Sequence, residues 1–395
     1  MRWLVLTSSV PRYDGDFSGL FVQSFCEALA ARGHRLDVLA WRGEGALART
    51  LGDEGTGVEL RFVPYGPPSM EELFYGAGAP ENLRESPLRA LLAPVAMGAM
   101  VGAALKACRE VAYDGVIGHW LLPAGALARV VGEIAGLPSF VVGHSGGVHL
   151  LSRVPPVVGR PLARWLTAVP TTVPTEALAQ TVRALGGEVT SVLPMGFDPP
   201  SEGVEFGGRR GVGELRVGFL GRLVAIKDLG TLLGAIEEAR AGGVSVTLEI
   251  VGDGPERQRW QAQAGDGVTF RGALMGEAKE EALRSWDVLA LPSRVRESGR
   301  HEGLPVTLLE AAARGTVPLV SGVPGAEEWL VHPWQVLPAG QSSEWARGIA
   351  GFADLDDRAL RELRWASAEQ VASLQWPRLA ADFERIFCAP EGPGV

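Results

Sequence analysis

The sequence predicts an α/β protein built from two halves, each a parallel β-sheet covered by helices. Short apolar runs alternate with helical patterns along the chain of 395 residues, which is typical of a doubly wound sheet. Six glycines and two prolines between residues 196 and 214 interrupt this alternation near the midpoint, and such a composition indicates a linker. The same alternation then restarts. We therefore expect two domains joined by a glycine-rich linker.

The first half contains seven expected strands, which are short apolar or β-branched runs at residues 3–7, 36–40, 58–63, 115–118, 139–142, 167–173 and 190–194. Helical patterns fit between most of them, at residues 19–31, 88–109, 124–135 and 175–185. No function can be assigned to the segment from residue 43 to residue 86, which includes the expected strand at 58–63.

The second half repeats this order, with expected strands at residues 215–220, 244–251, 268–270, 288–291 and 317–320. A helix is expected at residues 228–240, and further helices lie between the later strands. Residues 342–387 are rich in Ala, Leu, Arg, Glu and Trp and predict two or three amphipathic helices. No repeat of 20 to 50 residues recurs, which excludes a solenoid.

Charge and cysteine content narrow the classes of function. The chain has 37 basic and 46 acidic residues and a net charge of -9, which argues against a nucleic-acid-binding protein. Only three residues are lysines, Lys106, Lys227 and Lys279, so each of them deserves to be located. The three cysteines share no short spacing, which excludes a disulfide framework and a zinc knuckle and favours a reducing compartment.

The longest uncharged stretch covers residues 90–105 and includes Pro94, Gly98 and Gly102. It is shorter than the roughly 20 apolar residues that a spanning helix needs, so we predict a buried helix of a soluble domain. The alternative is peripheral contact with a membrane surface. The first residues lack the apolar run and the cleavage pattern of a signal peptide. We expect a cytoplasmic protein, with the inner face of the membrane as the alternative location.

Two cations follow the first strand of the second half. In open α/β sheets ligands bind beyond the carboxyl ends of the strands, which is where Gly221, Arg222 and Lys227 lie. Gly221 permits a tight turn, and Arg222 and Lys227 could hold a diphosphate at the next helix N-terminus. The alternative is a solvated surface pair.

A second candidate site is the run Glu302-Gly303-Leu304-Pro305, which precedes an apolar helix containing Glu310. Pro305 suits a first helical turn, and Gly303 lets backbone amides approach a ligand. Eight helical residues rise about 12 Å, so Glu302 and Glu310 could contact two ends of one extended ligand. The alternative is that Glu302 stabilises the helix dipole and that Glu310 is an ordinary exposed residue.

Several motifs together resemble one family. FLGRLVAIKDLGTLL, EIVGDGPER, VTFRG, DVLALPS and EGLPVTLLEAAARGTVPLVSGVPG occur in the order found in the C-terminal domain of retaining glycosyltransferases of family 4, the glycosyl transferases group 1. HWLLPAG, VVGHSGGVHLL, VPTEALAQTVRALG and PMGFD resemble the N-terminal domain of that family. The resemblance implies the GT-B fold, with two Rossmann-like domains facing a central cleft. It places an acceptor domain at 1–198, a linker at 199–214, a donor domain at 215–374 and, at 375–395, a helix that returns to the first domain.

The resemblance also implies an activity, the transfer of a sugar from a UDP- or GDP-sugar to an acceptor hydroxyl with retention at the anomeric carbon. The acceptor would be a glycan, a lipid-linked glycan or a small molecule, and the reaction would need no metal and no cofactor. Arg222 and Lys227 match the cations that stabilise the leaving diphosphate. The remaining matches to donor-binding positions are Glu302 at the donor sugar, Gly303 and Leu304 with their amides at the sugar or the phosphate, Glu310 at the ribose, Gly19 at the diphosphate, and Arg271 with Gly272 at the base.

Two histidines complete the predicted site. His144 matches the family histidine that contacts the donor sugar or the acceptor side, and His119 is a second candidate on the acceptor side. For both residues the alternative is a structural histidine that bonds backbone carbonyls. The acidic residue that many family members carry three positions after the histidine is missing here, where Gly147 stands.

A loop between Ser293 and Glu302 is longer than in many members and contains Arg294, Arg296, Arg300 and His301. We hypothesise that it covers the donor sugar or meets an anionic acceptor; the alternative is a solvated loop. Other functions remain open at this point: a non-catalytic module that binds sugar nucleotides, or an epimerase or phosphorylase on the same fold. A dehydrogenase is disfavoured because no G-x-G-x-x-G follows either first strand.

Overall fold

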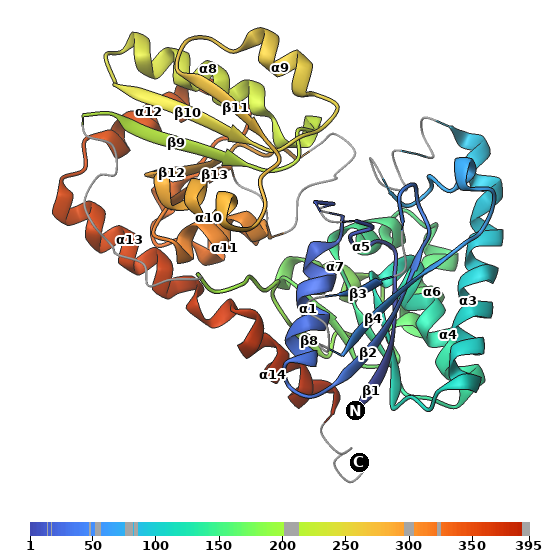
Figure 1. The fold of residues 1–395 in the computed structure, drawn as a ribbon. Coiled ribbons are helices and arrows are strands. Elements are labelled where there is room, and N and C mark those ends of the chain that lie inside the picture. Colours follow the sequence, from blue (N-terminus) through green and yellow to red (C-terminus); the bar gives the residue numbers. More distant parts are fainter. Residues whose placement is uncertain are drawn as a thin grey trace. The chain divides into compact units, whose positions relative to one another are not determined.

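The computed structural model describes residues 1–13, 15–16, 18–46, 49–51, 57–75, 82, 86–200, 213–295, 304–321 and 325–388. The chain forms two compact units (Figure 1). Unit 1 comprises Met1–Pro194 and Trp376–Val395, and unit 2 comprises Met195–Gln375. Most of the expected linker, residues 201–212, lies outside the described residues.

Unit 1 contains an eight-stranded sheet in the order β3-β4-β2-β1-β5-β6-β7-β8. The strands are β1 (Arg2–Thr7), β2 (Arg35–Trp41), β3 (Arg49–Leu51), β4 (Val58–Val63), β5 (Gly115–His119), β6 (Ser139–Val142), β7 (Thr171–Val173) and β8 (Ser191–Val192). Every pairing is parallel except that of the edge strand β3 with β4. The central strands are buried on both faces, as a parallel sheet covered by helices requires.

The helices of unit 1 are α1 (Leu20–Ala30), α3 (Ala93–Glu110), α4 (Ala126–Ala135), α5 (Ser145–Ser152), α6 (Pro156–Leu166), α7 (Glu176–Ala184) and α14 (Trp376–Phe387). Short turns lie at η1 (Pro68–Met70), η2 (Pro87–Leu92) and η3 (Leu121–Gly125). The C-terminal helix α14 packs on this unit through edge-on aromatic contacts, Phe383 with Phe25 at 4.8 Å and Phe387 with Phe140 at 4.9 Å between ring centroids. Glu384 adds a hydrogen bond to His34 Nε2 at 2.7 Å. These contacts fix the end of the chain to unit 1.

The structure corrects the prediction that residues 90–105 form a buried helix. Helix α3 buries only one stripe, consisting of Ala96, Met100, Ala104 and Ala107. Leu91 and Val95 are 74% and 54% exposed. The surrounding segment Arg89–Glu110 is long and apolar enough to cross a membrane by length and composition alone. Seven of its residues are alanines, which do not require burial on every face.

Unit 2 contains a six-stranded parallel sheet in the order β11-β10-β9-β12-β13-β14. The strands are β9 (Leu215–Leu220), β10 (Val246–Val251), β11 (Val268–Gly272), β12 (Val288–Leu291), β13 (Val317–Ser321) and β14 (Val336–Leu337). The helices are α8 (Leu229–Ala241), α9 (Arg257–Gln263), α10 (Gly276–Ser285), α11 (Val306–Ala313), α12 (Ser342–Ala353) and α13 (Asp357–Val371). Four short 3₁₀ turns complete the unit: η4 (Ala225–Lys227), η5 (Glu327–Trp329), η6 (Pro333–Gln335) and η7 (Ala372–Leu374).

Helices α8 and α12 cover one face of this sheet, and α10, α11 and α13 cover the other (Figure 1). The strands β9 and β12 lie side by side at the centre of the sheet, where the chain crosses from one side to the other. The strand order reverses at this point, and such a switch point is the usual ligand position in a doubly wound sheet. The loops after β9 and β12 are therefore where a ligand is expected.

Candidate active site

The loop after β9 holds Arg222, and a glycine turn after β10 supports it. A Cβ atom at Gly252 would lie 1.9 Å from the carbonyl oxygen of Gly221, and one at Gly254 would lie 2.4 Å from that of Leu223. Both glycines also adopt positive φ angles, of 142° and 158°. Leu223 donates its N–H to the carbonyl of Asp253 at 2.9 Å. Only glycine fits this close approach of two loops, so the pair of glycines fixes the backbone around Arg222.

The two predicted cations differ in their surroundings. The guanidinium of Arg222 is half-buried, and within the described residues it has no hydrogen bond or ion pair. Burial lowers the pKa of Arg222, although an arginine stays protonated in proteins. Lys227 ends η4, directly before α8, and its Nζ would lie 3.5 Å from a Cβ at Gly221. Its ammonium therefore lies over the turn that carries Arg222.

Arg294 is held by contacts within the protein. Its Nε forms an ion pair with Asp228, and its Nη2 donates to Thr231 Oγ1 at 3.2 Å. Its backbone N–H donates to the carbonyl of Ile226 at 2.9 Å. Arg294 therefore ties the segment after β12 to η4 and α8. The hypothesis that this loop covers the donor sugar or meets an anionic acceptor stays a prediction, and Arg296, Arg300 and His301 lie outside the described residues.

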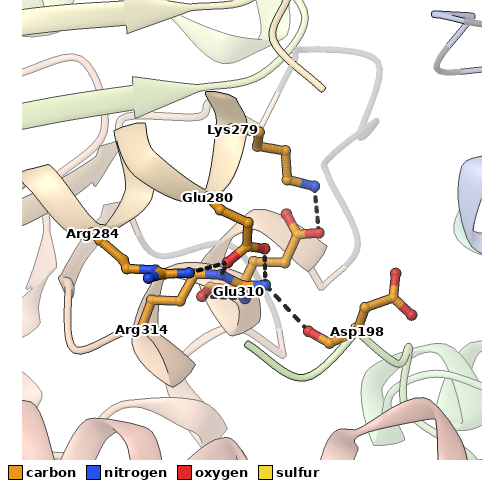
Figure 2. A network of polar contacts seen from close by, with 6 residues as sticks. All are labelled: Asp198, Lys279, Glu280, Arg284, Glu310 and Arg314. Atoms are coloured by element: carbon orange, nitrogen blue, oxygen red, sulfur yellow. Dashed lines mark hydrogen bonds and ion pairs between the residues drawn. The ribbon is translucent and has the colours of Figure 1, made fainter. Parts of the chain in front are cut away.

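A polar network surrounds Glu310 (Figure 2). Lys279 of α10 donates from Nζ to Glu310 Oε1 at 2.7 Å. Arg314, at the end of α11, bonds Glu280 Oε2 at 2.6 Å and the backbone carbonyls of Glu310 at 3.0 Å and Asp198 at 3.4 Å. Glu310 is only 9% exposed, so it is not the ordinary surface residue of the alternative interpretation. Its Oε2 has no hydrogen-bond partner in the described parts of the chain.

The other donor-site predictions are only partly covered by the described residues. Glu302 and Gly303 lie outside them, and Leu304 is buried beside the start of α11. Arg271 on β11 forms an ion pair with Glu249 of β10 at 3.2 Å. Gly272, the next residue, has a φ angle of 76° and accepts a hydrogen bond from Gly252 N–H at 2.8 Å. The structure therefore brings Gly272 next to the loop that supports Arg222.

In unit 1 the two predicted histidines contact each other. His119 ends β5 and His144 lies two residues after the end of β6, so both lie at the carboxyl edge of neighbouring strands. His119 Nδ1 lies 3.2 Å from His144 Nε2, and the two rings stack with an angle of 11° between their planes. Phe25 packs edge-on against His119, and Phe21 lies against His144 at 4.8 Å. Gly19 precedes both aromatic residues as the N-cap of α1.

The protonation of this histidine pair follows from its burial and from a ring nitrogen of His119 that has no hydrogen-bond partner among the described residues. His119 Nε2 is buried and has no hydrogen-bond partner among the described residues. A buried bare nitrogen costs less than a buried unpaired N–H, so we assign the proton of His119 to Nδ1, from where it donates to His144. The neutral His144 then carries its own proton on Nδ1. Burial lowers the pKa of His144 to about 3, and burial, together with the repulsion that a protonated His144 would exert, lowers the pKa of His119 well below its usual range.

These pKa values predict how stability depends on pH. Below pH 6.5 each histidine binds a proton in the unfolded chain but stays neutral in the folded chain, so unfolding becomes easier as the pH falls. The free energy of unfolding should fall by about 1.4 kcal/mol per pH unit for each histidine, down to the folded-state pKa. Urea unfolding between pH 7 and pH 5 should show a smaller slope for His144→Phe than for the wild type. Equal slopes would contradict the buried, neutral state.

Gly19 has a local structural reason to be glycine. Its φ angle is 67°, and a Cβ atom would lie 2.4 Å from the carbonyl oxygen of Ser9. An alanine here would therefore displace the loop before α1, whether or not a diphosphate binds nearby. Activity loss in a Gly19 variant cannot by itself assign the residue to the donor.

Sequence reasoning missed the roles of three residues. Gly252 and Gly254 are in the quoted motif EIVGDGPER, but their contact with the Arg222 loop depends on the neighbouring strands β9 and β10. Lys279 was noted only as one of three lysines, and its position four residues into α10 gave no sign that it reaches Glu310 on α11. The rarity of lysine in this sequence was the one feature that could have pointed to a specific role for Lys279.

Comparison with known proteins agrees with this geometry. The model of the family "Glycosyl transferases group 1" matches residues 214–354, which is most of unit 2. The 2-deoxystreptamine glucosyltransferase of Streptomyces kanamyceticus is 30% identical over 309 residues, which cover 70% of this chain and 77% of the relative. A GDP-mannose-dependent alpha-(1-6)-phosphatidylinositol monomannoside mannosyltransferase of Mycobacterium tuberculosis is 28% identical and covers 96% of both chains.

Solved structures share the fold over the whole length. Anabaena HepE, determined in complex with UDP and glucose, superposes with a TM-score of 0.69 at 16% identity, covering 99% of this chain and 100% of HepE. Sucrose-phosphate synthase from Thermosynechococcus elongatus gives a TM-score of 0.72 at 19% identity and covers 98% of both chains. The two Rossmann-like parallel-sheet units are those of the GT-B fold, and with the sequence relatives they show that this chain belongs to the group 1 glycosyltransferases.

Proposed function

We propose that this protein transfers a hexosyl group from a nucleotide-diphosphate sugar to an acceptor hydroxyl, with retention at the anomeric carbon. The observation that carries the proposal is the pair Arg222 and Lys227, two cations at the carboxyl edge of the central strand β9. Arg222 is half-buried without an internal partner in the described part of the chain. A desolvated guanidinium of this kind is suited to an anionic ligand.

The leaving group explains why two cations are needed. As the glycosidic bond breaks, negative charge grows on the diphosphate, and donors that are already in place stabilise it most. Arg222 would bind two phosphate oxygens through its planar fork, and Lys227 would add a compact charge. Glycine pairs fix the backbone around Arg222, so little reorganisation is needed when the charge develops. We propose that these cations take the place of a metal ion.

Glu310 is proposed to bind the ribose. Lys279 donates a hydrogen bond to Oε1, and Oε2 is left to accept a hydrogen bond from a ribose hydroxyl. Glu302, Gly303 and Leu304 are proposed to face the donor sugar, Gly19 the diphosphate, and Arg271 with Gly272 the base. These roles rest on the family resemblance of the motifs and on the position of α11 beside the sheet.

His144 is proposed to contact the donor sugar or the incoming acceptor. With a pKa of about 3 it is neutral at pH 7 and cannot act as an acid in its imidazolium form. A neutral His144 with its proton on Nδ1 donates one hydrogen bond to a sugar hydroxyl. His119 would act as a positioning residue, because its hydrogen bond to Nε2 selects this tautomer.

The donor is proposed to be a UDP- or GDP-hexose. Relatives are named as a glucosyltransferase and as a GDP-mannose-dependent mannosyltransferase, and the neighbour HepE binds UDP with glucose. The acceptor would be a glycan, a lipid-linked glycan or a small polyol. No nucleic acid is expected as a partner.

The test is a transfer assay with purified protein, UDP-glucose or GDP-mannose, and candidate acceptors, in the presence of EDTA. We expect nucleotide release with product in the same anomeric configuration as the donor, measured by NMR coupling constants, and undiminished by EDTA. Glu302→Gln should abolish transfer but preserve nucleotide binding. Binding of a nucleotide without turnover of any donor would instead identify a non-catalytic module, and inverted product would contradict retention.

A further inference from the structure

The corner between α5 and α6, defined here as residues 150–160, exposes an apolar tip. Val157 and Val158 in the first turn of α6 are 81% and 56% exposed, and Leu150 on α5 is 45% exposed. Pro155 and Pro156, which join the two helices, are exposed as well. Exposed large apolar side chains on both helices that meet at this corner cost solvation free energy unless a partner covers them.

Unpaired positive charge surrounds this tip. Arg153 and Arg160 are exposed, and neither forms an ion pair with any residue that the structure describes; Arg164 lies in the last turn of α6, away from the tip. No Asp or Glu occurs between Glu133 and Glu176, although the protein as a whole carries a charge of -9. The corner is therefore a basic patch on an acidic protein.

Carboxylates on the neighbouring elements do not neutralise the patch. Glu133 on α4 pairs with Arg129, and Glu176 on α7 pairs with Arg183. Glu188 is exposed beside the opposite end of α6, where its N–H bonds Thr167 Oγ1. The charge of the corner is thus available to an anionic partner.

An anionic lipid surface fits these observations better than a protein does. A stable protein interface buries about 800 Å² on each partner, whereas this tip consists of one helical turn and two prolines. Valine side chains that insert a few ångströms into a bilayer, beside arginines that reach lipid phosphates, are the usual combination in peripheral membrane proteins. Arginine also binds phosphate in a bidentate manner.

We propose that the α5–α6 corner docks this protein on anionic membranes, with Val157 and Val158 inserted and Arg153 and Arg160 on the lipid phosphates. Helix α5 begins directly after His144, and its eight residues rise about 12 Å. The corner therefore lies one short helix from the proposed acceptor-side histidine. If the proposed function holds, an acceptor carried by a lipid would be presented to the site by this docking.

The experiment measures binding of the full-length protein to sedimenting vesicles, without donor or acceptor. Vesicles of equal parts phosphatidylglycerol and phosphatidylcholine should bind the wild type, and phosphatidylcholine vesicles should bind it at least tenfold more weakly. Arg153→Gln/Arg160→Gln should weaken binding to the anionic vesicles by at least tenfold. Val157→Ser/Val158→Ser should weaken it by about tenfold. High salt should reduce binding of the wild type.

Two matched control variants distinguish binding through the corner from binding through exposed apolar or charged groups elsewhere on the surface. Leu91→Ser/Val95→Ser removes exposed apolar groups from α3, and Arg358→Gln/Arg361→Gln removes exposed charges from α13 in unit 2. Both should bind within twofold of the wild type. The proposal is overturned if the wild type does not bind anionic vesicles, or if the corner variants bind as well as the wild type. It is also overturned if the control variants lose as much binding as the corner variants. Because the assay needs no turnover, it is independent of the proposed catalytic activity.

Discussion

Replacing Arg222 by alanine should lower kcat by about 10²- to 10³-fold, and Lys227→Ala should have an effect of similar size. Each cation is proposed to stabilise charge that grows on the leaving diphosphate, and removal of one preorganised donor to such a charge costs this much. The KM for the donor should rise as well, because both groups also contact the diphosphate of the bound donor. Steady-state kinetics with the native donor measure both effects.

Two substitutions serve as controls for this prediction. Lys106→Ala removes another of the three lysines, one that is 74% exposed on α3, and Arg358→Ala removes an exposed arginine of α13. Both should leave kcat within about twofold of the wild type, because surface charges far from a reacting phosphate are screened. If Arg222→Ala behaves like these controls, the assignment of the diphosphate site is wrong.

The largest effect on stability is expected at Arg364 on α13. Its Nη2 lies 2.6 Å from Asp287 Oδ1, and neither side chain is exposed. Arg364→Met leaves the Asp287 carboxylate buried without its counter-charge, which should lower the free energy of unfolding by about 3–5 kcal/mol. Urea unfolding of unit 2, followed by tryptophan fluorescence, measures this loss.

Arg358→Met on the same helix provides the matched control, since Arg358 is 82% exposed and forms an exposed ion pair with Glu362. Its free energy of unfolding should stay within about 0.5 kcal/mol of the wild type. The double variant Asp287→Asn/Arg364→Met removes both charges and should regain part of the loss. If Arg364→Met proves no more costly than Arg358→Met, the ion pair does not stabilise the fold.

The sheets could be predicted from sequence because their central strands are buried on both faces and are therefore short apolar runs. Strands β4, β6, β9 and β12 have the bounds expected from their apolar runs. The expected strand at 167–173 is shorter, since α6 continues to Leu166 and β7 begins only at Thr171. The β-branched residues of this segment do not indicate where α6 ends.

Other elements were missed for identifiable reasons. Helices α5 and α6 are rich in Gly, Pro and Val, which disfavour helices in isolation, so packing on the sheet decides their conformation. Strands β3 and β14 have only three and two residues, too short for any periodicity.

In the candidate site, residue types were predictable from the motifs. Partners such as Lys279 with Glu310 or Arg294 with Asp228 depend on tertiary contacts between distant segments.

The most direct test of the central claim compares nucleoside diphosphates with monophosphates in a thermal-unfolding experiment. If Arg222 and Lys227 form a diphosphate site, UDP or GDP should stabilise the protein, by about 2.7 kcal/mol at a concentration 100 times the Kd. UMP and GMP should stabilise it far less, and Arg222→Ala should remove the difference. Stabilisation by none of these nucleotides, or equal stabilisation by diphosphates and monophosphates, would contradict the account.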